Sequence, residues 1–274
     1  MSFMYNPFPY DDPKPINRPE LSKETIDSVV TGGTPNVAKK FFAGIADKVK
    51  TEGVIVGIDG YTTANWKLFV DLLARECTIN NLEFEAVDSN EATLKSGKEI
   101  DDMIDPLLIW DTKIDPTLLY GKVYHGGYIG LFDEAKVADF QKAVPAKKAP
   151  GKLVVVAGYG AMISEFRDMY DVKCWFDLTP MRTMLRIRNG EYSNLGKERP
   201  GIINRTIRRC YYCDFECAVQ LRKDLWKNNV PDYFFLDNDH GKLQMMPYES
   251  FTDICAQLVK YPFRTKPCYL EGVW

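Results

Sequence analysis

Residues 59–67 have the residue types of a loop that could bind an anion. They read D-G-Y-T-T-A-N-W-K and join an apolar run to a stretch with helical periodicity. The backbone N–H groups of such a loop and the positive end of the following helix attract phosphate. The standard motif is G-x-x-x-x-G-K-[ST]. Gly60 occupies its first position, whereas Asn65, Trp66 and Lys67 replace the second glycine, the lysine and the hydroxyl residue.

These departures leave two interpretations open. Asn65 tolerates left-handed backbone, so the turn can keep its shape. Trp66 lacks the charge that holds the β- and γ-phosphates, and Lys67 points about 100° away from it around the helix. The loop is therefore either a weakened anion site or an ordinary strand-to-helix turn. For an anion site, the candidate phosphate-binding residues are Gly60, Thr62, Thr63, Asn65 and Lys67.

Two carboxylates are the last residues of predicted strands and are candidates for chemistry. Asp88 could take a proton from a substrate hydroxyl, or it could cap the next turn. Asp59 could orient Lys67 or a metal-bound water, and a turn-capping role is the alternative.

Basic and polar residues farther along the chain could complete the site. Arg182, Arg186 and Arg188 lie on one predicted helix, and the first two share a face because they are four residues apart. Guanidinium groups suit phosphate oxygens, although a solvated helix face is the alternative. His125 could contact substrate or hydrogen-bond a turn, and Tyr159 lies in a glycine-rich loop expected beside the pocket.

Cys210, Cys213 and Cys217 have the spacing of one helix face. Three cysteines on one continuous helix cannot easily surround a metal, so we predict core packing and single out no metal ligands.

Alternating strands and helices must position these residues. Apolar runs at 53–59, 82–88, 153–157, 172–177 and 232–236 predict strands. Helical patterns fall at 35–51, 65–75, 202–228 and 248–259, with another helix starting at Thr179-Pro180. The alternation predicts an α/β fold, a parallel sheet with helices on both faces. Residues 90–149 form an insertion with short helices near 98–105 and 133–144, and the five prolines of residues 1–20 predict an extended arm lying on the body.

Composition excludes several classes of protein. The net charge of −3 argues against a nucleic-acid partner. No stretch approaches the ~20 apolar residues that span a membrane. Without a signal peptide, seven cysteines at irregular spacing indicate reduced thiols in the cytoplasm. The chain has only two histidines, which argues against a histidine-built metal site.

Several of these features together resemble the uridine kinases and phosphoribulokinases. They are Asp59-Gly60, Asp88, the stretch YGKVYHG at 120–126, Trp175-Phe176-Asp177, and Arg182, Arg186 and Arg188. The resemblance implies a P-loop NTPase-like fold with Asp88 as the base and an arginine-rich lid helix. The family's third strand ends in glutamate and glycine, whereas this chain has Ala157-Gly158.

The C-terminal segment resembles another group of proteins. PFRTKP at 262–267, YLEGVW at 269–274 and YCDFE at 212–216 resemble bacterial class I mannose-6-phosphate isomerase-type proteins. In those proteins a kinase-like domain precedes a cupin domain that holds the zinc. After the arm at 1–20, the resemblance implies a kinase-like domain at 21–261 and a linker at 262–274 toward a possible cupin isomerase domain.

Two functions are consistent with these features. The first is a degenerate nucleoside- or sugar-kinase-like domain that binds a phosphorylated sugar or nucleotide and is associated with mannose-6-phosphate isomerase. The alternative is an active ATP-dependent phosphoryl transferase acting on a nucleoside or sugar. ATP and magnesium are the possible cofactors, and neither function calls for nucleic acid or a membrane.

Overall fold

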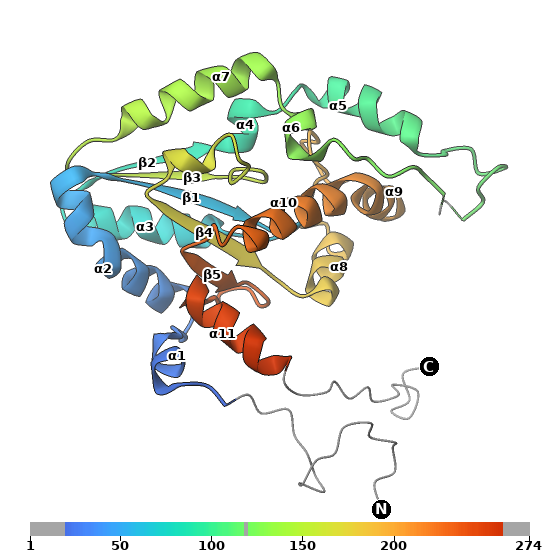
Figure 1. Ribbon diagram of the computed structural model, residues 1–274. Helices are drawn as coiled ribbons and strands as arrows, with labels where there is room; N and C mark the ends of the chain where they lie inside the picture. Colours follow the sequence, from blue (N-terminus) through green and yellow to red (C-terminus); the bar gives the residue numbers. More distant parts are fainter. Residues whose placement is uncertain (1–19, 118–119, 260–274) are drawn as a thin grey trace, which may run out of the picture.

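The computed structural model describes residues 20–117 and 120–259, which fold around one sheet (Figure 1). The strand order is β2-β3-β1-β4-β5-β6; the first five strands run parallel, and the last is antiparallel to β5. The strands are β1 (Val54–Gly60), β2 (Glu83–Asp88), β3 (Lys152–Ala157), β4 (Val172–Asp177), β5 (Tyr233–Leu236) and β6 (Gln244–Pro247). The five predicted strands are confirmed. The sequence prediction missed β6, which has only four residues and returns directly after β5.

Helices cover both faces of the sheet, as the alternation predicted (Figure 1). The helices of the first half of the described chain are α1 (Lys23–Ser28), α2 (Thr34–Glu52), α3 (Lys67–Ile79), α4 (Ser89–Thr93) and α5 (Gly97–Ile104). The second half has α6 (Gly127–Leu131), α7 (Glu134–Ala143), α8 (Pro180–Arg188), α9 (Ile203–Arg209), α10 (Phe215–Lys227) and α11 (Tyr248–Leu258). The predicted long helix at 202–228 is confirmed, and it contains a π-helical turn at Cys210–Asp214 between α9 and α10 that the sequence did not predict.

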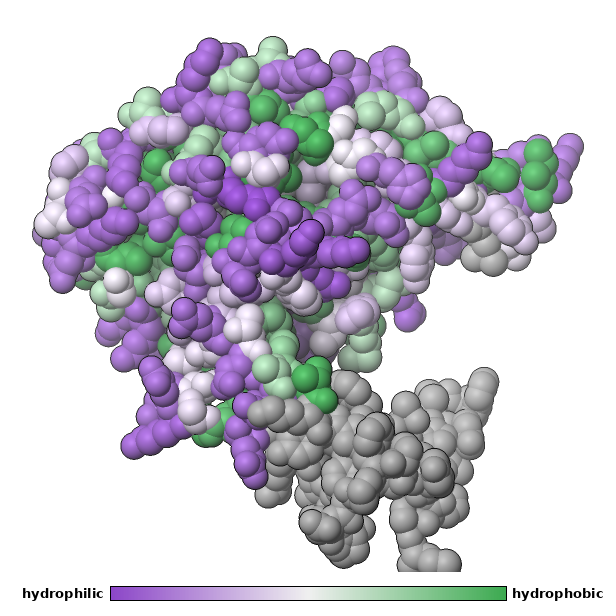
Figure 2. Space-filling model, in the orientation of Figure 1, coloured by the Kyte–Doolittle hydropathy of each residue, from purple (hydrophilic) through white to green (hydrophobic). Residues whose placement is uncertain are grey.

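The strand side chains alternate between two apolar layers. Val54, Val56 and Ile58 pack with α2 and α3, whereas Ile55 and Trp175 pack with the layer that contains α7 and α10. Because both sides of β1 are buried, the sequence of this strand is a nearly continuous run of apolar residues. The face of the molecule in Figure 2 is mostly hydrophilic, since the apolar sides of the helices are turned toward the sheet. No helix in the described ranges is long and apolar enough to cross a membrane.

The cysteine triplet lies in the core, which confirms the predicted packing. Cys210, Cys213 and Cys217 are buried on the helix that spans the π turn. Their spacing therefore reflects the buried face of a helix.

Gly57 in the middle of β1 tests how tightly this core is packed. A Cβ atom there would lie 2.3 Å from Cδ2 of Tyr170. That ring is buried, and its hydroxyl donates to the Ala161 carbonyl at 2.8 Å, so it cannot move aside freely. We expect Gly57→Ala to lower the free energy of unfolding by about 1–3 kcal/mol in urea denaturation.

Gly44→Ala is the matched control for that substitution. Gly44 lies inside α2 with no atom within 4 Å of the added Cβ. The same chemical change should there raise the free energy of unfolding by about 0.5–1 kcal/mol. Equal effects at the two positions would contradict the packing described for β1.

Candidate phosphate-loop site

The loop from Gly60 to Trp66 joins β1 to α3 at the carboxyl end of the sheet, where open parallel sheets bind ligands. The Tyr61 N–H donates to the Phe176 carbonyl at 2.9 Å, so the loop leaves β1 against the end of β4. Gly60 is required, since a Cβ atom would lie 2.6 Å from that carbonyl oxygen. Thr63 has a φ of 74°, which is left-handed backbone for a β-branched residue. The loop is therefore a tightly constrained turn.

A buried ion pair between Arg186 and Asp237 holds this loop. Arg186 is 4% exposed, and its Nη1 donates to Asp237 Oδ2 at 2.7 Å and to the Thr63 carbonyl at 2.8 Å. Its Nη2 donates to the Asp237 carbonyl at 2.8 Å and to Oδ1 at 3.2 Å. The Asn65 N–H also donates to Asp237 Oδ2 at 2.7 Å. If the loop were an anion site, the Asn65 N–H would be expected to donate to phosphate. In the structure this N–H donates to the Asp237 carboxylate instead.

The sequence prediction missed Asp237, although a usable signal existed. It directly follows β5, so it lies at the same sheet edge as the loop, just as Asp88 directly ends β2. Arg186 was predicted to bind a ligand phosphate; in the structure its guanidinium pairs with Asp237, and the residue also lines a cavity at this edge. Its partner could not be read from local spacing, because the two residues are 51 positions apart.

Asp59 connects the loop to the segment after β3. Its side chain is fully buried and accepts backbone N–H groups from Gly60 at 2.7 Å, Gly160 at 3.2 Å and Met162 at 2.8 Å. Burial raises the pKa of Asp59 to about 7, although the three backbone donors act in the opposite direction. These contacts match the turn-capping role that the sequence left open.

Trp66 occupies the lysine position of the standard loop and packs among aromatic rings. Its ring centroid lies 5.1 Å from that of Tyr159 and 6.3 Å from that of Phe176. The Tyr159 hydroxyl donates to the Ala64 carbonyl at 3.2 Å, which places Tyr159 beside the loop as expected. Apolar packing thus replaces a cation here.

Two neighbouring cavities open at this edge and share Trp66 and Lys67. The first, of about 260 Å³, is lined by Thr63, Ala64, Asn65, Trp66, Lys67, Tyr159, Arg186 and Glu191. The second, of about 320 Å³, is lined by Trp66, Lys67, Val70, Asp71, Ala86, Val87, Asp88, Val155 and Ala157. Most of the predicted loop residues therefore meet at one cavity, and Asp88 borders the adjoining one.

Asp88 is exposed and also caps α4. Its Oδ1 accepts the N–H groups of Asn90 at 2.8 Å and Glu91 at 3.0 Å. The capping alternative is thus observed, and the carboxylate still lines the cavity.

The remaining candidates are not among the residues that line the two cavities. Arg182 pairs with Asp239 at 2.8 Å, and Arg188 and His125 are exposed and line neither cavity. Thr62 is buried, and its hydroxyl donates to the Asp214 carbonyl at 3.3 Å.

The fold and the loop define an α/β protein whose first strand, turn and helix are arranged as in phosphate-binding-loop proteins. The chain belongs to the family described as "Domain of unknown function (DUF8485)", whose model matches residues 41–260. No curated protein matches the sequence.

Three similar solved structures are kinases by description. One is a protein assigned as a fructose transport system kinase from Silicibacter sp. TM1040, with 12% identity, 70% of this chain and 95% of that chain covered, and a TM-score of 0.45. The second is a possible uridine kinase from Bacillus stearothermophilus (11% identity, 72% and 97% covered, TM-score 0.43). The third is phosphoribulokinase from Rhodobacter spheroides (11% identity, 77% and 95% covered, TM-score 0.39).

Asp237→Asn should be strongly destabilising. The substitution leaves the buried Arg186 charge without its counter-charge, which typically costs about 3–5 kcal/mol of unfolding free energy. Chemical denaturation measures the loss. Asp239→Asn is the control, because it removes the partner of the more exposed Arg182 and should cost no more than about 1 kcal/mol. A similar small loss for both variants would show that Asp237 does not hold the loop.

Asp59 should make stability depend on pH. Its folded pKa of about 7 lies above the ordinary 3.8, so folding favours the neutral carboxyl. The stabilisation is complete below pH 3.8 and is lost as pH rises through about 7, with a slope of at most ~1.4 kcal/mol per pH unit. Unfolding free energies measured from pH 4 to 8 should fall more steeply for the natural protein than for Asp59→Asn.

The comparison of those two proteins isolates Asp59 from other buried carboxyls. Burial also raises the pKa of Asp177 and of Asp214, and both remain in the Asp59→Asn variant. Identical pH slopes would mean that Asp59 stays ionised across this range.

Proposed function

We propose that the chain is a kinase-like binding domain that holds a small phosphorylated ligand and does not transfer its phosphoryl group. The observation that carries the proposal is the Arg186–Asp237 pair beside Trp66. The family description assigns no activity, so the proposal rests on the chemistry of the site.

Charge at the loop argues against phosphoryl transfer. Catalysis of that reaction depends on cations that stabilise the phosphates in the transition state. Of the residues that line the two cavities, Lys67 and Arg186 are positively charged, and Asp237 neutralises Arg186. An aromatic ring stands at the lysine position of the motif. Asp71, Asp88 and Glu191 line the same cavities, so anion binding in this proposal rests on Lys67 and on the N-terminal turn of α3, and little positive charge is left to activate a phosphoryl group.

The two cavities suit a ligand with a phosphate and a partly apolar body. The exposed Lys67 and the N-terminal turn of the 13-residue α3 would hold the phosphate. Val70, Val87 and Ala157 would contact the body, and Asp88 would accept hydroxyl groups. A sugar phosphate or a nucleotide has this combination of groups.

The wider setting is proposed from sequence alone. An association with mannose-6-phosphate isomerase, through a possible cupin isomerase domain, is supported by the resemblance at 262–274, which lies outside the described residues. A cytoplasmic location is supported by the reduced-thiol interpretation of the cysteines.

One observation favours the second candidate, an active transferase using ATP and magnesium. Asp88 is exposed on the wall of the cavity that also contains Lys67, where a base could meet an acceptor hydroxyl.

Thermal-shift titrations test the proposal and separate it from the alternative. The ligands are fructose 6-phosphate, mannose 6-phosphate, ADP, ATP with magnesium, and inorganic phosphate. A ligand at about 100 times its Kd adds about 2.7 kcal/mol of stability. Shifts without turnover support a binding domain. A magnesium-dependent shift with ATP, followed by turnover of a sugar or nucleoside, would establish the alternative.

Lys67→Ala should weaken binding of whichever phosphorylated ligand shifts the melting temperature. A hydrogen bond to a charged group contributes about 1.5–3 kcal/mol, so Kd measured by calorimetry should rise roughly 10–100-fold. Lys40→Ala is the control, since that exposed lysine lies on α2 and lines neither cavity. Unchanged affinity in Lys67→Ala would remove the loop from the binding site.

A further inference from the structure

The second cavity at the loop, of about 320 Å³, carries more negative than positive charge. Lys67, Asp71 and Asp88 are its charged lining residues, and all three are exposed. In the first cavity, Arg186 is neutralised by its buried partner, and Glu191 is bonded to a histidine. A ligand whose only charged group is a phosphate would therefore satisfy the lysine and be repelled by the two aspartates.

The two aspartates are available to a ligand. Within the described part of the chain, neither Asp71 nor Asp88 forms an ion pair with a lysine or arginine. The N–H groups that Asp88 accepts as the cap of α4 both bond its Oδ1, which leaves Oδ2. Asp71 follows Lys67 by four residues on α3, which is about 6 Å along the helix axis. A cation site thus lies about one helical turn from the proposed phosphate position.

A buried hydroxyl at the first cavity is a separate observation that points to a ligand. Thr63 lines that cavity and is only 4% exposed, and its Oγ1 has no hydrogen-bond partner among the described residues. A buried polar group without a partner costs free energy. An oxygen of a bound phosphate would accept a hydrogen bond from this hydroxyl.

We infer that the ligand is a phosphate ester that also carries a protonated amine. The inference rests on the proposed function and names its ligand class. The phosphate lies at Lys67, the N-terminal turn of α3 and the Thr63 hydroxyl, and the amine lies between Asp71 and Asp88. The amine balances the carboxylates that a phosphate alone leaves uncompensated. Phosphorylated amino sugars and phosphorylated amino alcohols have this pair of groups.

Calorimetry with ligands that differ in one group tests the inference. Glucosamine 6-phosphate and glucose 6-phosphate differ only in an amine or a hydroxyl, and phosphoethanolamine and ethyl phosphate repeat the comparison without a sugar ring. In EDTA at about pH 6.5, where the amine is protonated, the amine ligand of each pair should bind about tenfold tighter. N-acetylglucosamine 6-phosphate keeps the nitrogen without its charge and should bind no tighter than glucose 6-phosphate.

Removing both carboxylates should abolish this preference. In Asp71→Asn with Asp88→Asn, the two ligands of a pair should bind within about twofold of each other, because neither amide attracts the amine. Glucose 6-phosphate should bind at least as tightly as to the natural protein, since only negative charge is removed. Asparagine is also a good helix N-cap, so the variant preserves the cap of α4.

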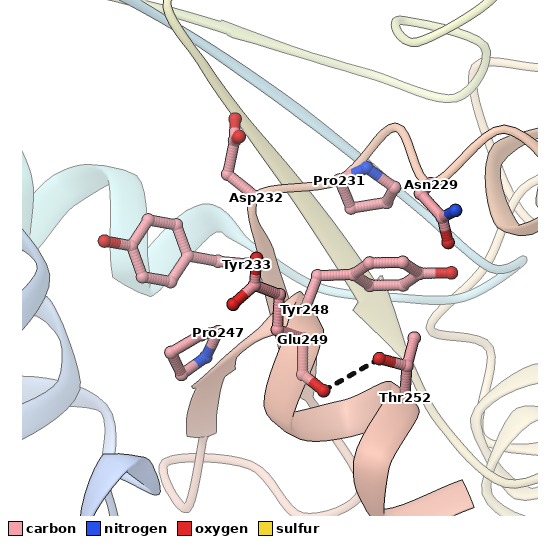
Figure 3. Close-up of a pocket in the computed structure, with 8 residues that line it drawn as sticks. All are labelled: Asn229, Pro231, Asp232, Tyr233, Pro247, Tyr248, Glu249 and Thr252. Carbon is pink, nitrogen blue, oxygen red and sulfur yellow. Dashed lines mark hydrogen bonds between the residues drawn. The ribbon is translucent and has the colours of Figure 1, made fainter. Parts of the chain in front are cut away.

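A separate cleft supplies the control (Figure 3). It has a volume of about 570 Å³ and lies at the amino end of β5, away from the loop. Its exposed Glu249 lines neither loop cavity, and the same holds for Glu52 at the end of α2. Glu52→Gln with Glu249→Gln removes as much charge as the double aspartate variant and should leave the preference at about tenfold. Asp232 of this cleft is left intact, because it accepts the Lys173 N–H at 2.7 Å.

The possible failures are distinguishable. Equal affinities within both ligand pairs would overturn the inference and leave the proposed function standing. A preference that survives in the double aspartate variant, or that the N-acetyl ligand shares, would also overturn it, because the amine charge would not meet these carboxylates. If no preference exists in EDTA and magnesium tightens both ligands, the carboxylates hold a metal ion instead. No binding of any of these ligands would count against the proposed function and the inference together.

Discussion

The buried pair of Arg186 and Asp237 is the interaction on which the carboxyl edge of the sheet depends. It joins α8 and the end of β5 to the backbone of the loop after β1. The Asp237 N–H also donates to the Asp177 carbonyl at 2.8 Å, which extends the connection to the end of β4. A buried arginine is tolerated only when its charge is paired, and a strained turn persists only when its surroundings fix it. The pair satisfies both conditions.

This arrangement explains how the loop keeps its shape with Asn65, Trp66 and Lys67 at the last three positions of the standard motif. Asp59 holds the start of the loop to the segment after β3, and Tyr159 bonds its middle. A loop fixed by internal partners needs no ligand to order it, so binding costs less conformational entropy. The same pairing consumes the positive charge of Arg186. The loop is therefore preorganised while the charge of Arg186 is neutralised by Asp237, and both features are consistent with the binding domain proposed above.

The sequence predicted the fold better than the site, for a physical reason. Apolar runs such as those of β1 and β3 mark buried parallel strands, because burial on both faces leaves a local pattern. The order of strands and helices also predicted that the candidate site lies at the carboxyl ends of the parallel strands. The four residues of β6 are too few to show the alternation of apolar and polar residues that marks a strand. The π turn at Cys210–Asp214 hardly changes the spacing of apolar residues along its helix, so the sequence does not reveal it. The Arg186–Asp237 contact joins distant elements, so no local spacing reveals it.

The π turn at Cys210–Asp214 also holds the loop after β1, from the side of the sheet covered by α10. It carries the buried Asp214, whose carboxylate accepts hydrogen bonds from Tyr192 at 2.9 Å and Asn194 at 2.7 Å. The carbonyl of the same residue accepts the Thr62 hydroxyl. Three separate parts of the fold thus contact three residues of the loop: the α9–α10 helix at Thr62, α8 at Thr63 and the end of β5 at Asn65. These contacts fix the turn from Thr62 to Asn65, and the Trp66 ring packs next to it against Tyr159 and Phe176. In the proposed function, a ligand at this edge would meet the side chains of Trp66 and Lys67 and the walls of the adjoining cavities.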